Sequence, residues 1–88
     1  MRLADNRALY DYLVSFAAHL RRHGADEMAD AVTGAYKQAA GLSTEFLGES
    51  RLALRRVRDS NVAGLSVKDQ TDLTEVLEQL DAALDGKR

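Results

Sequence analysis

The chain has no cysteine, no proline and no tryptophan among its 88 residues. Without cysteine it can form neither a disulfide framework nor a thiolate metal site, which is typical of a protein in a reducing compartment. No apolar stretch approaches the roughly 18 residues that a membrane-spanning helix needs, and no secretory leader pattern precedes Asp5. We therefore expect a cytoplasmic protein.

The composition favours helices. The absence of proline removes the residue that most often interrupts a helix, and Ala, Leu, Glu and Arg are abundant. A composition of 45% hydrophobic and 30% charged residues fits a globular domain. No segment shows the alternation of a strand. The sequence predicts an all-α fold in a single helical domain over residues 1–88.

The tetrapeptide Ala-Gly-Leu-Ser occurs twice, at residues 40–43 and 63–66. In each copy the glycine can turn the chain with a positive φ, and the serine can cap the helix that follows. After Ser66, Asp69 stands at the position from which a side chain closes a capping box. The tetrapeptide therefore predicts two helix starts.

Apolar periodicity between these and other turn signals predicts four helices. They cover about residues 5–23, 26–40, 44–59 and 67–85. Gly24, Gly41 and Gly86 stand where helices would end. Because the first two links are short, neighbouring helices should run antiparallel or cross sharply. We expect a compact four-helix bundle or two packed helical hairpins, with a candidate hinge at residues 61–66 before the acidic fourth helix.

Each predicted helix has an apolar face that should form the core. The faces consist of Leu9, Leu13, Phe16 and Leu20; Met28, Val32, Ala35, Tyr36 and Ala39; Phe46, Leu47, Ala53, Leu54 and Val57; and Leu73, Val76, Leu77, Leu80 and Leu84. Small side chains dominate the second face, so a partner helix could approach it closely. Leu52 lies about 120° from Phe46 on the helical wheel, and Val14 is also displaced from its apolar face. These displaced residues favour a homodimer or another protein partner.

Charge is nearly balanced over the chain but unevenly distributed, with a net charge of −2. Acidic residues recur at steps of three along residues 67–85, so this helix is acidic on every exposed side. Arg51, Arg55 and Arg58 form a stripe on the preceding helix. We expect the stripe to face the acidic helix, in the same chain or in a second copy. The alternative is a solvated surface, where ion pairs contribute little.

His19 and His23 are weak metal-ligand candidates. They stand four residues apart, so both imidazoles project from one side of a helix, the spacing that a two-histidine metal site needs. Two ligands are too few, and no glutamate lies between them as in a metalloprotease motif. We favour the interpretation that His23, with Arg21 and Arg22, complements the negative end of the first helix. No metal or cofactor is predicted.

Common catalytic patterns are missing from the sequence. The chain has no glycine-rich phosphate loop and no nucleophile elbow. Its Gly-Leu-Ser order differs from the Asp-Ser-Leu of acyl carrier proteins, and Arg22 and His23 stand where histidine phosphotransfer domains have Lys and Gly. No small-molecule substrate is evident, and we expect no enzyme activity.

Residues 26–59 resemble a helix-turn-helix DNA-binding unit. Tyr36 and Ala40 supply apolar positions before the turn, Gly41 takes the usual glycine place, and Leu47 fills the buried position after it. The resemblance implies that the helix after the turn enters the major groove, with its arginine stripe near phosphates.

We favour a small helical protein–protein interaction module without catalytic activity: an adaptor, a regulatory subunit or an oligomerisation domain. Its expected partner interface consists of Leu52 with Arg51, Arg55 and Arg58. The expected partner is a second copy or another protein, and no membrane surface is expected because no basic amphipathic helix has a large exposed apolar face. The alternative is a DNA-binding regulator that uses the helix-turn-helix.

Overall fold

The structure, a computed structural model, describes residues 1–37, 43–62 and 64–86. These residues form four helices and no strand: α1 (Asn6–Arg22), α2 (Asp26–Lys37), α3 (Ser43–Ser60) and α4 (Val67–Asp85). The predicted all-α fold is therefore confirmed. α3 starts and ends one residue outside its predicted bounds. The predicted last turn of α2 and its stop at Gly41 lie outside the described residues.

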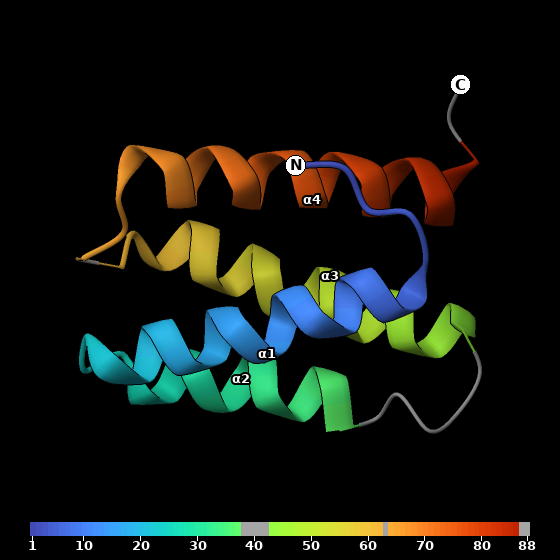
Figure 1. The fold of residues 1–88 in the computed structure, drawn as a ribbon. Helices are drawn as coiled ribbons and strands as arrows, with labels where there is room; N and C mark the ends of the chain where they lie inside the picture. The colour runs from blue at the N-terminus through green and yellow to red at the C-terminus, as the bar shows by residue number, and fades with distance from the viewer. Residues whose placement is uncertain (38–42, 63, 87–88) are drawn as a thin grey trace.

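Consecutive helices run in opposite directions and pack side by side (Figure 1). α1 packs against α2, α2 against α3, and α3 against α4. The resulting globule measures 33 × 26 × 20 Å along its principal axes. This is the compact four-helix arrangement that the short links predict.

The segment before α1 lies across α4 (Figure 1). The backbone N–H of Leu3 donates to Gln79 Oε1 at 2.8 Å, and Gln79 Nε2 donates to the carbonyl oxygen of Met1 at 2.7 Å. These hydrogen bonds join the first residues of the chain to its last helix.

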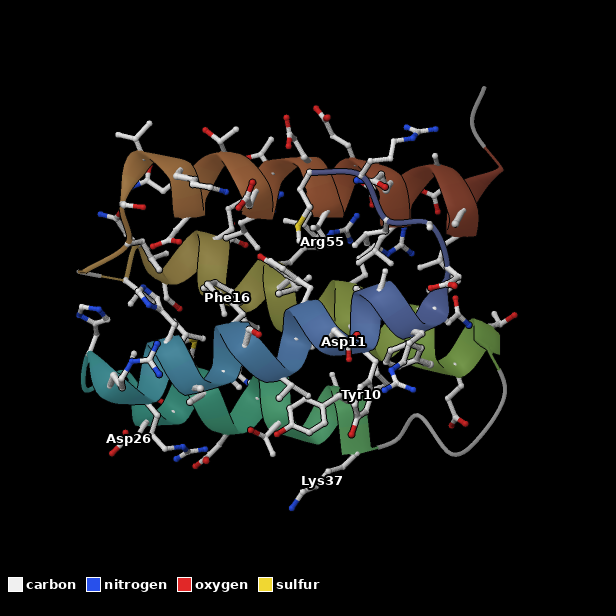
Figure 2. All side chains as sticks on the ribbon, viewed as in Figure 1. Tyr10, Asp11, Phe16, Asp26, Lys37 and Arg55 are labelled. Carbon is white, nitrogen blue, oxygen red and sulfur yellow. The ribbon has the colours of Figure 1, made fainter. Side chains whose placement is uncertain are left out.

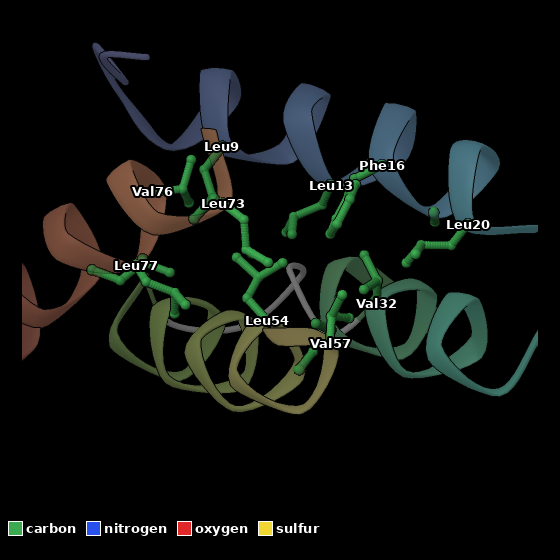
Figure 3. Close-up of a cluster of buried hydrophobic side chains, with 14 of the residues drawn as sticks. Leu9, Leu13, Phe16, Leu20, Val32, Leu54, Val57, Leu73, Val76 and Leu77 are labelled. Carbon is green, nitrogen blue, oxygen red and sulfur yellow. The ribbon is translucent and has the colours of Figure 1, made fainter. Parts of the chain in front are cut away.

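All four helices contribute to one core of buried apolar side chains (Figure 3). Its largest fully buried apolar members are Leu9, Leu13, Leu20, Leu54, Val32, Val57 and Val76. Met28, Tyr36 and Leu47 pack partly buried at its edge, and Leu84 is only partly buried. The predicted apolar faces thus form the core, apart from Ala39, which lies outside the described residues. Ser50, which no apolar face included, is fully buried.

The second copy of the tetrapeptide starts α4 as predicted. Ser66 Oγ accepts from the backbone N–H of Asp69 at 3.0 Å, and the Asp69 carboxylate accepts from the backbone N–H of Ser66 at 3.1 Å. This is the predicted capping box. Gly64 has φ +91°, and Gly86 ends α4 with φ +66°. In the first copy, residues 40–42 and the Ser43 side chain lie outside the described part of the chain.

Candidate functional site

The structure divides the predicted partner interface between two surfaces. Leu52 is 57% exposed in the middle of α3. Arg51 and Arg55 turn toward α4 instead, and Arg58 pairs with its neighbour Asp59 at 3.0 Å. All four residues lie on α3, but only Leu52 among them borders the groove between α2 and α3.

Arg51 and Arg55 form an α3–α4 ionic cluster with Asp81 and Asp85. Arg51 Nη1 lies 3.2 Å from Asp81 Oδ1 and 3.0 Å from Asp85 Oδ1, and Arg55 Nη2 lies 3.0 Å from Asp81 Oδ1. Figure 2 shows Arg55 reaching toward α4. The hydrogen bond to Asp85 raises the pKa of the Arg51 guanidinium most, and the hydrogen bond to Asp81 adds to the effect. The arginine stripe thus meets the acidic helix within one chain, through two of its three members.

This cluster bears on the DNA-binding alternative. That interpretation needs the arginine stripe to contact phosphates, because Lys and Arg supply most non-specific affinity for DNA. Arg51 and Arg55 already contact carboxylates of α4. DNA binding stays a prediction, and it requires the ionic cluster to open or to share its arginines.

A groove between α2 and α3 lies beside Leu52. Its wall from α2 consists of Asp30, Ala31, Gly34 and Ala35, and its wall from α3 of Glu49, Leu52, Ala53 and Arg56. The lining therefore combines five small or apolar residues with three charged ones. We refer to these eight residues as the Leu52 groove.

Gly34 leaves the Leu52 groove open within α2. A Cβ built on Gly34 meets no heavy atom within 4 Å, and its φ is not positive. Neither crowding inside the described chain nor backbone conformation requires a glycine here. Glycine inside a helix costs roughly 0.5–1 kcal/mol relative to alanine. The fold of the single chain therefore gains nothing from this residue.

The charged residues of the Leu52 groove differ in how they are paired. Asp30 pairs with Arg21 at 3.0 Å. Arg56 Nη2 lies 3.9 Å from Glu27 Oε2, a long contact between exposed side chains. Glu49 makes no ion pair with any described residue. As far as the described residues go, the groove thus offers one carboxylate without an ion-pair partner and one loosely paired guanidinium, both on α3.

His19 lies beside the start of α4, and His23 lies next to His19. His19 Nε2 lies 3.1 Å from Asp69 Oδ2 without hydrogen-bond geometry, and the two imidazole centroids are 4.5 Å apart. Among the described residues, no group of three or more His, Asp or Glu side chains could hold a metal ion. The backbone N–H of His23 caps the end of α1. His19 thus lies against Asp69 of the α4 capping box, and His23 lies at the end of α1.

Tyr12 places a buried hydroxyl near the same carboxylates. Its oxygen has no hydrogen-bond partner among the described residues. Burial raises the pKa of the Tyr12 phenol, and the charges of Asp72 and Asp69 add to the effect. The phenol is therefore held neutral, which makes it a poor proton donor.

No protein-family model, curated protein or solved structure matches this chain. Within the described ranges, none of the helices combines the length and the apolar character needed to cross a membrane. Three of the four predicted interface residues therefore lie on two surfaces: Leu52 on the Leu52 groove, and Arg51 and Arg55 in the α3–α4 ionic cluster.

Proposed function

We propose that this chain is a small helical protein–protein interaction module with no catalytic activity of its own, and that its partner covers the Leu52 groove. The exposure of Leu52 carries the proposal. Covering a leucine that is 57% exposed contributes on the order of 1 kcal/mol to an interface.

The anatomy of the groove supports binding of a protein. Protein–protein interfaces have an apolar centre and a polar rim. The Leu52 groove likewise combines apolar and small residues with the charged residues Asp30, Glu49 and Arg56. The proposed role is that of an adaptor, a regulatory subunit or an oligomerisation domain.

The proposed location is the cytoplasm, which the lack of cysteine supports.

Photo-crosslinking tests the proposal. A photo-reactive amino acid replaces Leu52 in one variant and Val67 in the control, both in cells of the organism that makes the chain. Val67 is 80% exposed at the start of α4, outside the Leu52 groove, so it reports random collisions. We expect a discrete protein adduct from position 52 alone. Equal labelling from both positions overturns the proposal.

A further inference from the structure

We propose that the partner on the Leu52 groove is a second copy of this chain, bound through an antiparallel pairing of the two α3 helices about a two-fold axis beside Leu52. The proposal rests on the proposed function, because it names the partner of that same surface. In a two-fold interface each copy contributes the same patch, so the patch must complement itself.

The order of charges along α3 meets this requirement. Among the α3 residues of the Leu52 groove, acidic Glu49 precedes Leu52 and basic Arg56 follows it. An axis between Leu52 and Ala53 places Glu49 opposite Arg56 of the second copy, and the symmetry repeats this pair. A parallel pairing would place Glu49 beside Glu49, which like-charge repulsion disfavours. The charge pattern therefore selects the antiparallel pairing.

Glu49 and Arg56 are available to form ion pairs with a second copy. Glu49 has no ion-pair partner among the described residues, and Arg56 is held only by its 3.9 Å contact with Glu27. Arg51 and Arg55, in contrast, are engaged by α4 at 3.0 to 3.2 Å. A second copy can thus pair with Glu49 and Arg56 without opening the α3–α4 ionic cluster.

The shape of the groove also fits a second α3. Leu52 is exposed on α3, and the small residues Ala31, Gly34 and Ala53 line the same groove. A glycine at a helix surface allows another backbone to approach closely. The open space where a Gly34 Cβ would lie can therefore receive Leu52 of the second copy, which supplies the reason for Gly34 that the single chain lacks.

Sedimentation equilibrium of the full chain over a wide concentration range is the first test. We expect the wild type to form dimers and Leu52→Glu to weaken them by roughly tenfold or more. Val67→Glu, a matched apolar-to-acidic change outside the groove, should leave the dimer intact. Far-UV circular dichroism and the Tm establish that each variant is folded. A wild type that stays monomeric at every concentration overturns the proposal.

Charge reversal tests the antiparallel geometry. Glu49→Arg places two arginines opposite each other, and Arg56→Glu places two glutamates opposite each other, so each variant alone should dimerise roughly tenfold or more weakly than the wild type. An equimolar mixture of the two should form heterodimers, since every contact then joins opposite charges. A mixture that associates no better than its components overturns the antiparallel pairing.

Sedimentation equilibrium and photo-crosslinking together distinguish self-association from binding of another protein. A monomeric chain that still crosslinks to another protein from position 52 contradicts the self-pairing and leaves the interaction module standing. A monomeric chain without a specific adduct contradicts both.

Discussion

The backbone of Gly64 lies against the imidazole of His23. A Cβ built on Gly64 would stand 2.8 Å from His23 Nδ1 and 3.0 Å from His23 Cγ, closer than side chains approach one another. Gly64 also has φ +91°, which L side chains rarely adopt. The connection between α3 and α4 is thus joined to the end of α1 by a contact that only glycine permits.

Gly64→Ala should destabilise the fold through both effects. Holding an alanine at this positive φ costs about 1–2 kcal/mol of unfolding free energy, and the collision with His23 adds to that cost. Urea unfolding measures the loss. In the His23→Ala background the approaches to Nδ1 and Cγ disappear and only the 3.2 Å approach to the Cβ of residue 23 remains, so the same substitution should cost less than it does in the wild type. Equal costs in the two backgrounds would show that His23 does not restrict position 64.

Ser50→Ala should stabilise the protein. The Ser50 hydroxyl is fully buried and has no hydrogen-bond partner among the described residues, so its desolvation is uncompensated. We expect a gain of about 1 kcal/mol in the free energy of unfolding. Ser15→Ala, at an exposed position of α1, measures the gain from helix propensity alone. The prediction fails if Ser50→Ala gains no more than this control.

The capping box should make the stability of α4 depend on pH. The hydrogen bond from the Ser66 backbone, followed by the Ser66 hydroxyl and the His19 charge, lowers the pKa of Asp69 from 3.8, although desolvation opposes the shift. Because the folded state has the lower pKa, this stabilisation is present above about pH 4 and is lost as pH falls through the folded value.

Asp69→Asn should therefore have a lower free energy of unfolding than the wild type at pH 7. The difference between the two free energies should be smaller at pH 3. Urea unfolding at the two pH values measures it. Glu78→Gln serves as control, because Glu78 is an exposed carboxylate of α4 that makes no hydrogen bond or ion pair with described residues. A difference for Asp69→Asn that stays constant with pH would contradict the capping role.

Opening the α3–α4 ionic cluster should uncover anion binding. Asp81→Asn combined with Asp85→Asn frees Arg51 and Arg55, so this variant should bind labelled random duplex DNA more tightly than the wild type, with steep salt dependence. Fluorescence anisotropy at low and physiological salt measures the binding. Salt-sensitive binding by the wild type that is lost when Arg51, Arg55 and Arg58 become Ala would favour the DNA-binding regulator over the proposed function.

Gly34→Ala should move folding and self-association in opposite directions. The unfolding free energy of the monomer should rise by about 0.5–1 kcal/mol, because alanine is the better helix former and its Cβ meets no neighbour in the chain. The dimer should weaken, because the same Cβ occupies the space proposed for Leu52 of the second copy. Unchanged association of the stabilised variant would contradict a close approach at Gly34.

Local patterns predicted most of the fold. The spacing of Ser66 and Asp69 was enough for the capping box, because its hydrogen bonds span three residues. The apolar faces followed from helical periodicity in the same way. Opposite charges indicated that the arginine stripe meets α4, but charge alone left open whether this happens within one chain. The contact of Arg51 with Asp81 resolves that choice.

Contacts between distant segments could not be predicted from these patterns. The approach of His19 to Asp69 depends on how α1 and α4 are rotated about their axes, which no periodicity specifies. The Leu52 groove likewise depends on the packing of α2 against α3. The sequence singled out Leu52 and the small residues of α2 separately, and only the fold brings Gly34 and Leu52 to the same groove.

The packing of each helix on its neighbour in the sequence has a kinetic consequence. Contacts between adjacent helices close short loops, and chains rich in such contacts fold within microseconds to milliseconds. The hydrogen bonds that join Gln79 to Leu3 and Met1 span sequence separations of 76 and 78, and they close the longest loops among the hydrogen bonds of the described residues. These hydrogen bonds between the first residues and α4 should therefore form after the rate-limiting step. Losing them should then speed unfolding and leave the folding rate unchanged.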